Sequence, residues 1–390
     1  MPFLEMTFKN GPIFSDVKSL DRCNAAPREV ETCRYRLGER DGHLSAVRET
    51  VLDIHSHFYP RWYLDLLHDR SSIPRVSRSD EVEEFVIFPE EENPQHGGRV
   101  ITEDYWSLES KLSYMERFGI DQTLLSLGNP WLDFLDESQG VEIARHLNDD
   151  FSTLGSRTKG RILGMGALPG AGVENVSVVI REIAAQENLF GAITGTRIAG
   201  YAFDAPELDP VWLALQDSGL PLLVHPHYGL ALDQLEGFGH AMPVAVGFPL
   251  ETTVCLARLV YAGVLHRFPG VRLVGSHGGG ALPFLAGRLD AGWSSDPGLV
   301  SRMPTPPSDV LDQLFLDAVL YHPRALRTAA DLVGAGHLMF GTDHPFSIAD
   351  PAANLSAIKE AFSDEEALLV LASSAMDLYK MPAKDGQTWT

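Results

Sequence analysis

Two histidines end the first strongly apolar segment of this chain, VLDIHSH. His55 and His57 are separated by one residue, and side chains alternate along a strand, so both imidazoles project from the same side. Two neutral imidazoles placed in this way could share one cation. The chain has 14 histidines, however, and a chance pair or a hydrogen-bonded structural pair explains this motif alone equally well. The other strands must decide between these interpretations.

Three further apolar segments end in residues that can bind a metal. His225 follows LPLLV, His277 follows VRLVGS and Asp343 follows HLMFGT. Two more histidines lie close by, at His227 and His344. In a parallel α/β barrel the carboxyl ends of the strands meet at one rim, so residues far apart in the sequence converge there. Four such strand ends together predict a metal-binding catalytic rim rather than unrelated core residues.

Eight strands are needed to position these residues, and the chain supplies eight candidates. From residue 50 onward, short runs rich in β-branched residues or leucine alternate with longer segments of helical spacing, as in βα units. Eight such units favour a closed (β/α)8 barrel of the α/β class over an open sheet, because closure leaves no strand edge. The predicted strands are Thr50–Ile54, Gln122–Leu127, Arg161–Ala167, Gly191–Thr196, Leu220–Val224, Val271–Gly275, Leu314–Ala318 and His337–Phe340.

The chain outside these units is less regular. Residues 1–49 have few periodic apolar positions, so we expect an N-terminal extension or packing arm there, followed by one barrel domain over residues 50–390. The stretch from Pro60 to about Tyr105 is too long and too polar for one crossover, which predicts an insertion after the first strand. A lid over the barrel mouth and a tolerated surface loop are both open interpretations of this insertion.

Bulk composition limits the classes of function. The 390 residues are 44% hydrophobic and 22% charged, as in globular proteins, and the net charge of -22 argues against a nucleic-acid or membrane-surface partner. The cysteines Cys23, Cys33 and Cys255 are too few and scattered for a disulfide framework or a zinc ribbon. No signal peptide or membrane span is apparent in the sequence, so a cytoplasmic location is expected.

These motifs resemble the amidohydrolase superfamily, in its branch related to aminocarboxymuconate-semialdehyde decarboxylase. The resemblance runs from Val51 to about Tyr379. The segments GNPWLDFL, HPHYGL, GHAMPVAVGFPLETT, LPFLAGRLD and FGTDHPF look most like those of fungal isoorotate (uracil-5-carboxylate) decarboxylases. The resemblance implies one divalent metal, commonly zinc and in some members manganese. The ligands that it implies are His55, His57, His225 and Asp343.

The resemblance also implies catalytic and substrate-binding residues. His277 matches the catalytic histidine of strand six, and Asp343 is implied as the proton donor to carbon in addition to its role as a ligand. Many relatives with two metals carry a carboxylated lysine after strand four, where this chain has Thr196 and Arg197, and this difference supports a single metal. The implied substrate contacts are Arg99, Asn129, Phe248, Arg288 and Phe346.

We therefore expect nonoxidative decarboxylation of a pyrimidine or aromatic carboxylic acid with an oxygen ortho to the carboxylate, since one cation can chelate both groups. Uracil-5-carboxylate is the first expected substrate, and a salicylate-type or orsellinate-type acid is the second. Two alternatives stay open, namely hydrolysis of a lactone or amide by metal-activated water and a metal-binding barrel without turnover. A homodimer is expected by analogy with related barrels.

Overall fold

The protein is described here by a computed structural model, over residues 36–38, 45–47, 50–79, 82–92 and 97–381. Internal contacts divide the chain into two units, Met1–Glu49 and Thr50–Thr390. In the first unit, strands β1 (Arg36–Gly38) and β2 (Ser45–Val47) pair antiparallel. The rest of the expected N-terminal extension lies outside the described residues, as do Cys23 and Cys33.

The second unit contains a parallel sheet of eight strands, and each overlaps a strand predicted from the sequence. In spatial order they are β3 (Leu52–His57), β7 (Gln122–Ser126), β8 (Ile162–Ala167), β9 (Leu189–Thr194), β12 (Leu222–Val224), β13 (Leu273–Gly275), β14 (Phe315–Asp317) and β15 (Leu338–Met339). The first and last strands meet, because the N–H of Ile54 donates to the carbonyl of Phe340 at 3.0 Å and Ser56 bridges His344 in parallel. The fold is therefore the predicted (β/α)8 barrel.

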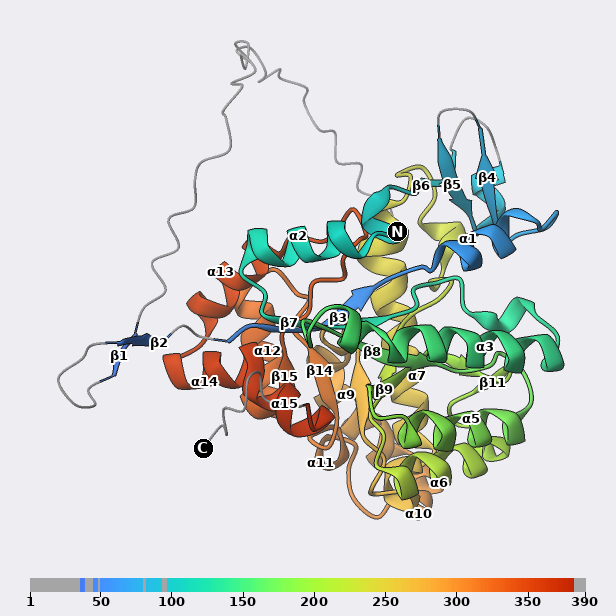
Figure 1. Cartoon of the computed structure of the whole chain (residues 1–390). Helices are drawn as coiled ribbons and strands as arrows, with labels where there is room; N and C mark the ends of the chain where they lie inside the picture. The colour runs from blue at the N-terminus through green and yellow to red at the C-terminus, as the bar shows by residue number, and fades with distance from the viewer. Residues whose placement is uncertain (1–35, 39–44, 48–49, 80–81, 93–96, 382–390) are drawn as a thin grey trace, which may run out of the picture. The chain divides into compact units, whose positions relative to one another are not determined.

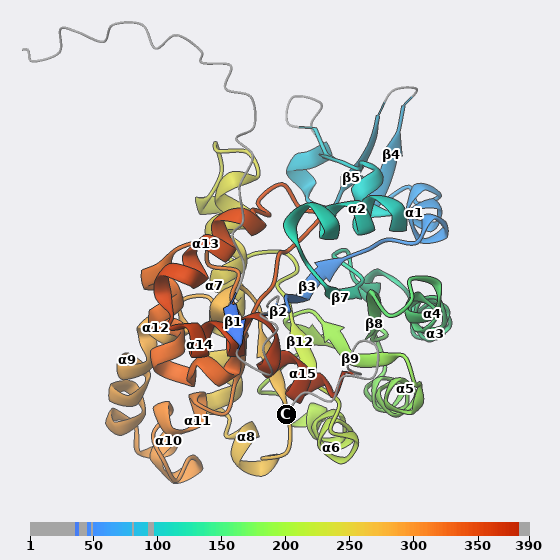
Figure 2. The same ribbon diagram turned by 60° about the vertical axis from the view of Figure 1, so that its left-hand side comes forward.

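Helices occupy the connections between the strands, and Figures 1 and 2 show them lying around the sheet. All residues of β3 and β8 are buried, as expected for parallel strands that are covered on both faces. The described helices are α1 (Arg61–His68), α2 (Leu108–Phe118), α3 (Glu137–Ser152), α4 (Leu154–Arg157), α5 (Val173–Ala185), α6 (Asp209–Ser218), α7 (Phe248–Tyr261), α8 (Val264–Arg267), α9 (Leu282–Ser295), α10 (Pro297–Arg302), α11 (Ser308–Leu311), α12 (Pro323–Val333), α13 (Pro351–Ala361), α14 (Asp364–Leu368) and α15 (Ser374–Tyr379).

Local sequence sets the ends of the helix that matters most below, α2. The hydroxyl of Ser107 accepts the N–H of Ser110 and so caps its first turn. Gly119 ends the helix with a φ of 67°, a left-handed conformation that glycine adopts without a steric cost. The helix is thereby held at both ends between the insertion and strand β7.

The insertion after β3 forms a small sheet of its own. Strands β4 (Arg75–Arg78), β5 (Glu83–Val86) and β6 (Arg99–Val100) pair antiparallel in the order β4-β5-β6. Figure 2 shows β4 and β5 next to α1 and α2, beyond the end of β3. The ring of Phe85 lies 5.0 Å from that of Tyr59, so the insertion packs on residues that directly follow the first barrel strand. A lid role for it stays a prediction.

The register of the strands places their carboxyl ends at one level. Val224 on β12 pairs with Thr194 on β9 and with Gly275 on β13. Strand β3 continues to His57, which pairs with Ser126, and so extends past the predicted end at Ile54. Residues that follow these positions therefore meet at the same rim of the barrel.

One helical stretch, Pro243–Tyr261, has the length and the mean hydropathy, 1.4, of a membrane span, although no span was predicted from the sequence. It combines a π-helical turn, η6 (Pro243–Gly247), with α7. Core helices pass the same test, and Phe248, Leu256 and Leu259 of this stretch are buried in the hydrophobic core. Length and composition alone make it weak evidence for a membrane.

Candidate metal centre

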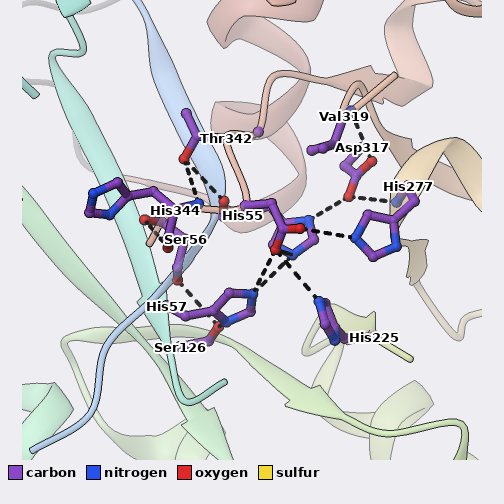
Figure 3. A network of polar contacts seen from close by, with 12 residues as sticks. His55, Ser56, His57, Ser126, His225, His277, Asp317, Val319, Thr342 and His344 are labelled. Atoms are coloured by element: carbon purple, nitrogen blue, oxygen red, sulfur yellow. Dashed lines mark hydrogen bonds and ion pairs between the residues drawn. The ribbon is translucent and has the colours of Figure 1, made fainter. Parts of the chain in front are cut away.

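Four buried side chains converge at the rim of the barrel. The ligand atoms of His55, His57, His225 and Asp343 all lie within 4.8 Å of one another. The Nε2 atoms of His55 and His57 are 3.1 Å apart, and Oδ1 of Asp343 lies 3.2, 3.3 and 3.7 Å from the Nε2 atoms of His55, His57 and His225. Figure 3 shows the three rings turned toward one another. Tetrahedral ligands about 2 Å from one cation are ~3.3 Å apart, so this spacing fits a single metal ion.

Hydrogen bonds at Nδ1 leave the Nε2 atoms of two of these rings available for a cation. Nδ1 of His57 lies 3.2 Å from the carbonyl oxygen of Leu127, and Nδ1 of His225 lies 2.7 Å from that of Pro226. A carbonyl oxygen only accepts, so each Nδ1 carries the proton and each Nε2 presents its lone pair. In the described part of the chain, Nε2 of His225 and Oδ1 of Asp343 have no hydrogen-bond partner, although both are buried. These orphaned atoms fit a site for a divalent metal.

Without a bound metal the four side chains differ in charge. Burial lowers the pKa of His57 to about 4 and that of His225 to about 3. Burial also acts to lower the pKa of His55, but the carboxylates of Asp343 and Asp317 outweigh it and raise this pKa to about 10. Burial alone would raise the pKa of Asp343, yet His55 and the other imidazoles hold it well below its usual range. His55 is therefore the protonated imidazole of the metal-free site.

Metal binding at neutral pH should release about one proton, because His55 must lose its proton before Nε2 can coordinate. The proton is bound below the raised pKa of about 10, so the release should fade as the pH rises through that value. Calorimetric titration of zinc into chelator-treated protein, in buffers with different ionisation enthalpies, gives the proton count. A count near zero at pH 7 would show that His55 is already neutral.

A buried aspartate at the end of β14 supports the site from behind. Oδ2 of Asp317 lies 2.6 Å from Nδ1 of His55 and accepts the backbone N–H of His277 at 2.9 Å (Figure 3). Oδ1 accepts the N–H of Gly278 at 2.9 Å and that of Val319 at 3.1 Å. One carboxylate thus orients an imidazole of the metal site and fixes the turn that carries His277. Asp317 is not among the site residues predicted from the sequence, although it too ends an apolar strand.

Replacement of Asp317 by Asn should weaken zinc binding by roughly 10- to 100-fold, the usual effect of removing the carboxylate partner of a metal-bound histidine. The amide keeps the shape of the side chain, but it has one acceptor atom where the carboxylate has two that face N–H donors. Competition with a chromophoric chelator measures the affinity, and thermal melting of the metal-free variant checks the fold. An affinity equal to that of the wild type would remove Asp317 from the site.

His277 and Asp343 face each other beside this cluster. Nε2 of His277 lies 3.4 Å from Oδ2 of Asp343, whereas the three imidazoles surround Oδ1. The ring of His277 is not among the four candidate ligands. Both residues have left-handed backbones, with φ of 53° and 59°, and such conformations in non-glycine residues concentrate at functional sites. The two oxygens of Asp343 therefore have different neighbours.

Three of the predicted substrate contacts lie near the rim. The ring of Phe346 is 5.1 Å from that of His57. Asn129 is buried, and its Nδ2 donates to the carbonyl of His227 at 3.0 Å while its Oδ1 has no partner among the described residues. Phe248 is the buried first residue of α7. All three are thus placed on segments that follow barrel strands.

The two predicted arginines lie on other elements, Arg99 on β6 and Arg288 on α9. Nε of Arg99, in the insertion, is 3.3 Å from Oε1 of Glu91, and the guanidinium lies 5.5 Å from the ring centre of Phe88. Arg288 is exposed on α9 and has no hydrogen bond or ion pair to the described part of the chain. Phe284, one helical turn earlier, is also 81% exposed. The structure thus leaves the substrate role of both arginines a prediction.

The residues that follow β9, the fourth strand of the barrel, make structural hydrogen bonds and are not among the candidate metal ligands. The hydroxyl of Thr196 donates to Glu251, which also accepts the backbone N–H groups of His227 and Tyr228 at 3.2 Å. Nη1 of Arg197 donates to the carbonyl of Gly200 at 2.9 Å. Within the described ranges, one cluster of residues could hold a metal ion. A single metal stays a prediction.

A cavity of about 430 Å³ opens next to the cluster. Trp131 forms part of its wall, and the ring of this residue lies 5.7 Å from that of His225. His227, Thr194 and Glu251 also line the cavity. The cavity is large enough for a molecule of one aromatic ring, but neither the four candidate ligands nor His277 line it.

Comparison with known proteins identifies the family. The amidohydrolase family model matches residues 52–380. The crystal structure of Metarhizium anisopliae IDCase, an isoorotate decarboxylase, is 35% identical with a TM-score of 0.80, and the match covers 86% of this chain and 98% of that one. A 2-amino-3-carboxymuconate-6-semialdehyde decarboxylase of Dictyostelium discoideum is 26% identical over 283 residues, 72% of this chain and 78% of its own.

A third match shows the fold alone. The structure of a dihydroxybenzoic acid decarboxylase from Polaromonas, with bound manganese, is 20% identical with a TM-score of 0.68 and covers 85% of this chain and 97% of that one. The resemblance drawn from the sequence motifs is confirmed by these matches. The chain belongs to the amidohydrolase family and is a metal-dependent decarboxylase within it.

Proposed function

We propose that this protein removes carbon dioxide from uracil-5-carboxylate, with a salicylate-type or orsellinate-type acid as the second candidate substrate. The observation that carries the proposal is the arrangement of Asp343, with Oδ1 among three imidazoles and Oδ2 facing His277. The 35% identity to an isoorotate decarboxylase over 98% of its length favours the pyrimidine.

The proposed ligands of the metal are His55, His57, His225 and Asp343. A divalent cation held there would attract the substrate carboxylate and its ortho oxygen and stabilise negative charge on that oxygen. We propose zinc as this cation, with manganese, which the Polaromonas relative binds, as the second choice.

Asp343 is the proposed proton donor to the ring carbon. Protonation precedes the loss of carbon dioxide, since direct cleavage at an sp2 carbon would leave an unstabilised carbanion. The low pKa of Asp343 makes its protonated form a strong acid but a rare one. His277, with Nε2 3.4 Å from Oδ2, is placed to return the proton to that oxygen.

Substrate orientation is proposed to come from the other predicted residues. Oδ1 of Asn129, buried and without a described partner, would accept a ring N–H, which a pyrimidine has and a benzoate lacks. Phe346 and Phe248 would bound the ring, and Arg99 would also contact the substrate. Arg288 would pair with a second anionic or carbonyl edge. A cytoplasmic location and a homodimer stay predictions from composition and analogy.

Replacement of Arg288 by Gln should raise KM by roughly 10- to 100-fold with little change in kcat, because a charge-assisted hydrogen bond to substrate contributes about 1.5–3 kcal/mol. Steady-state kinetics with uracil-5-carboxylate measure both constants. The matched control is Arg181→Gln, since Arg181 is an exposed arginine on α5. If KM is the same in both variants, Arg288 does not contact the substrate.

The proposed function is tested by incubating the purified protein with uracil-5-carboxylate and a panel of 2-hydroxybenzoates, with and without chelator. We expect carbon dioxide and uracil, loss of turnover with chelator, and recovery on addition of zinc or manganese. A lactone and an amide in the same panel test the hydrolase alternative. Hydrolysis without release of carbon dioxide would overturn the proposal.

A further inference from the structure

A buried lysine lies directly behind the candidate metal centre. Lys111, on α2, is 1% exposed, and its ammonium group donates to Oγ of Ser56 at 2.9 Å and to Nδ1 of His344. Ser56 lies between His55 and His57 in β3, so its side chain points to the opposite face of the strand from theirs. The lysine therefore reaches the back of the strand that carries two of the proposed ligands.

The two acceptors of Lys111 belong to two segments that together carry three proposed ligands. We call their contact the seam, formed by residues 55–57 and residues 342–344. Across it, the N–H of His57 donates to the carbonyl of His344 at 2.7 Å, and the N–H of Asp343 donates to the carbonyl of His55 at 2.8 Å. The hydroxyl of Ser56 donates to the same carbonyl of His344 at 3.2 Å. Lys111 adds a tie between side chains on both sides of the seam.

A lysine in this position needs a physical reason, since an unpaired buried charge costs several kcal/mol. Asp53, itself buried, is the carboxylate with the largest electrostatic effect on Lys111. Asp53 accepts the hydroxyl of Thr342 at 2.7 Å and the N–H of His55 at 3.0 Å, so it too joins the seam. The centre of the Tyr114 ring lies 3.7 Å from that of His344 and 5.9 Å from the ammonium group of Lys111. A lysine and an aspartate thus hold the seam from two sides.

The backbone of Asp343 gives this tie its importance. Its φ of 59° is rare for a residue with a side chain, and such a conformation is unfavourable unless the surroundings impose it. The neighbouring residue, His344, is held through its ring by Lys111 and through its carbonyl by His57 and Ser56. Restraint of His344 therefore restrains the carboxylate one residue before it.

We propose that Lys111 is a positioning residue of the metal centre, which ties Ser56 to His344 and so holds Asp343 at the distance from His55 and His57 that one cation requires. This rests on the proposed metal-dependent function, but zinc binding tests it without any substrate. Lys111 has no place in the reaction itself, because both of its contacts lie behind the residues that would meet the substrate.

The test is the zinc affinity of Lys111→Met, a change that keeps length and removes the charge. Competition with a chromophoric chelator should show affinity lower by roughly 10- to 100-fold, as for other residues that orient metal ligands. Lys359→Met is the control, since Lys359 is exposed on α13, and its affinity should equal that of the wild type. Ser56→Ala removes one of the two acceptors and should lose part of the affinity.

A double variant separates positioning from general stability. If Lys111 and Ser56 act through one tie, Lys111→Met with Ser56→Ala should lose little more affinity than Lys111→Met alone. Melting of the metal-free proteins reports stability independently. A lower melting temperature with unchanged zinc affinity in the folded Lys111→Met protein would overturn the proposal. If that variant does not fold, unchanged zinc affinity of the Ser56→Ala protein would overturn it instead. Altered zinc binding without decarboxylation of any tested acid would leave this inference standing and defeat the proposed function.

Discussion

The Asp343→Asn variant should lose turnover by roughly 10²- to 10⁴-fold, the usual contribution of a general acid, even when its metal site is filled. An amide cannot donate the proton that the ring carbon needs, and it is a weaker ligand than a carboxylate. The fold should persist, because the N–H of residue 343 still donates to the carbonyl of His55 and asparagine tolerates a left-handed φ. Turnover of uracil-5-carboxylate, with metal content measured on the same sample, checks this expectation.

Loss of a ligand and loss of an acid must be told apart in this variant. Raising the zinc concentration until the site is filled removes the first effect and leaves the second. The Asp317→Asn variant serves as the comparison, since Asp317 hydrogen-bonds His55 in the wild type and is not the proposed proton donor. Recovery of turnover by added zinc is expected for Asp317→Asn only. An active, metal-loaded Asp343→Asn protein would overturn the role of Asp343 as the acid.

The barrel could be predicted because its strands are buried on both faces and therefore appear as continuous apolar runs. The ends of the strands were less predictable. Strand β3 extends through His57, a polar residue that a hydrophobic run does not include, because its partners on β7 and the seam with residue 344 continue the ladder. A strand ends where its hydrogen-bonding partners end. The sequence of one strand does not show which residues of other strands will pair with it.

The residues of the rim were found by one rule, that polar residues ending apolar strands converge. The rule located the imidazoles and Asp343. It would also have found Asp317 had it been applied to β14, the seventh strand of the barrel. The rule could not find Lys111, because this residue does not end a strand. It lies in the charged segment LESKLSYMERF, whose composition predicts a solvent-exposed helix residue. Its burial is a product of the tertiary packing of α2 on the seam.

The arginines mark the limit of motif-based assignment. Arg99 lies in an insertion whose register no pattern defines, and the structure pairs it with Glu91. Arg288 belongs to a long motif, yet α9 leaves it exposed. A motif gives the identity of a residue and its place in the chain, whereas the reach of a long side chain depends on surroundings that only the fold provides.

The His277→Asn variant should lose kcat by roughly 10²- to 10⁴-fold while its zinc affinity stays within about tenfold of wild type. The proposed role of His277 is to return the proton to Oδ2 of Asp343, and its ring is not among the four candidate ligands. Asparagine is the substitution of choice because the backbone φ here is 53°, which asparagine accepts more readily than most residues. Kinetics at saturating metal and chelator competition measure the two quantities.

The solvent isotope effect separates a proton carrier from a packing residue in this variant. If His277 delivers the proton, its loss makes proton transfer slower than the cleavage step, and the ratio of kcat in H2O to that in D2O should rise above that of the wild type. Loss of packing around Asp317, whose carboxylate also accepts the N–H of residue 277, would instead lower zinc affinity and leave the isotope effect unchanged. A variant with wild-type kcat would exclude His277 from proton transfer, and Asp343 would then have to exchange its proton directly with solvent.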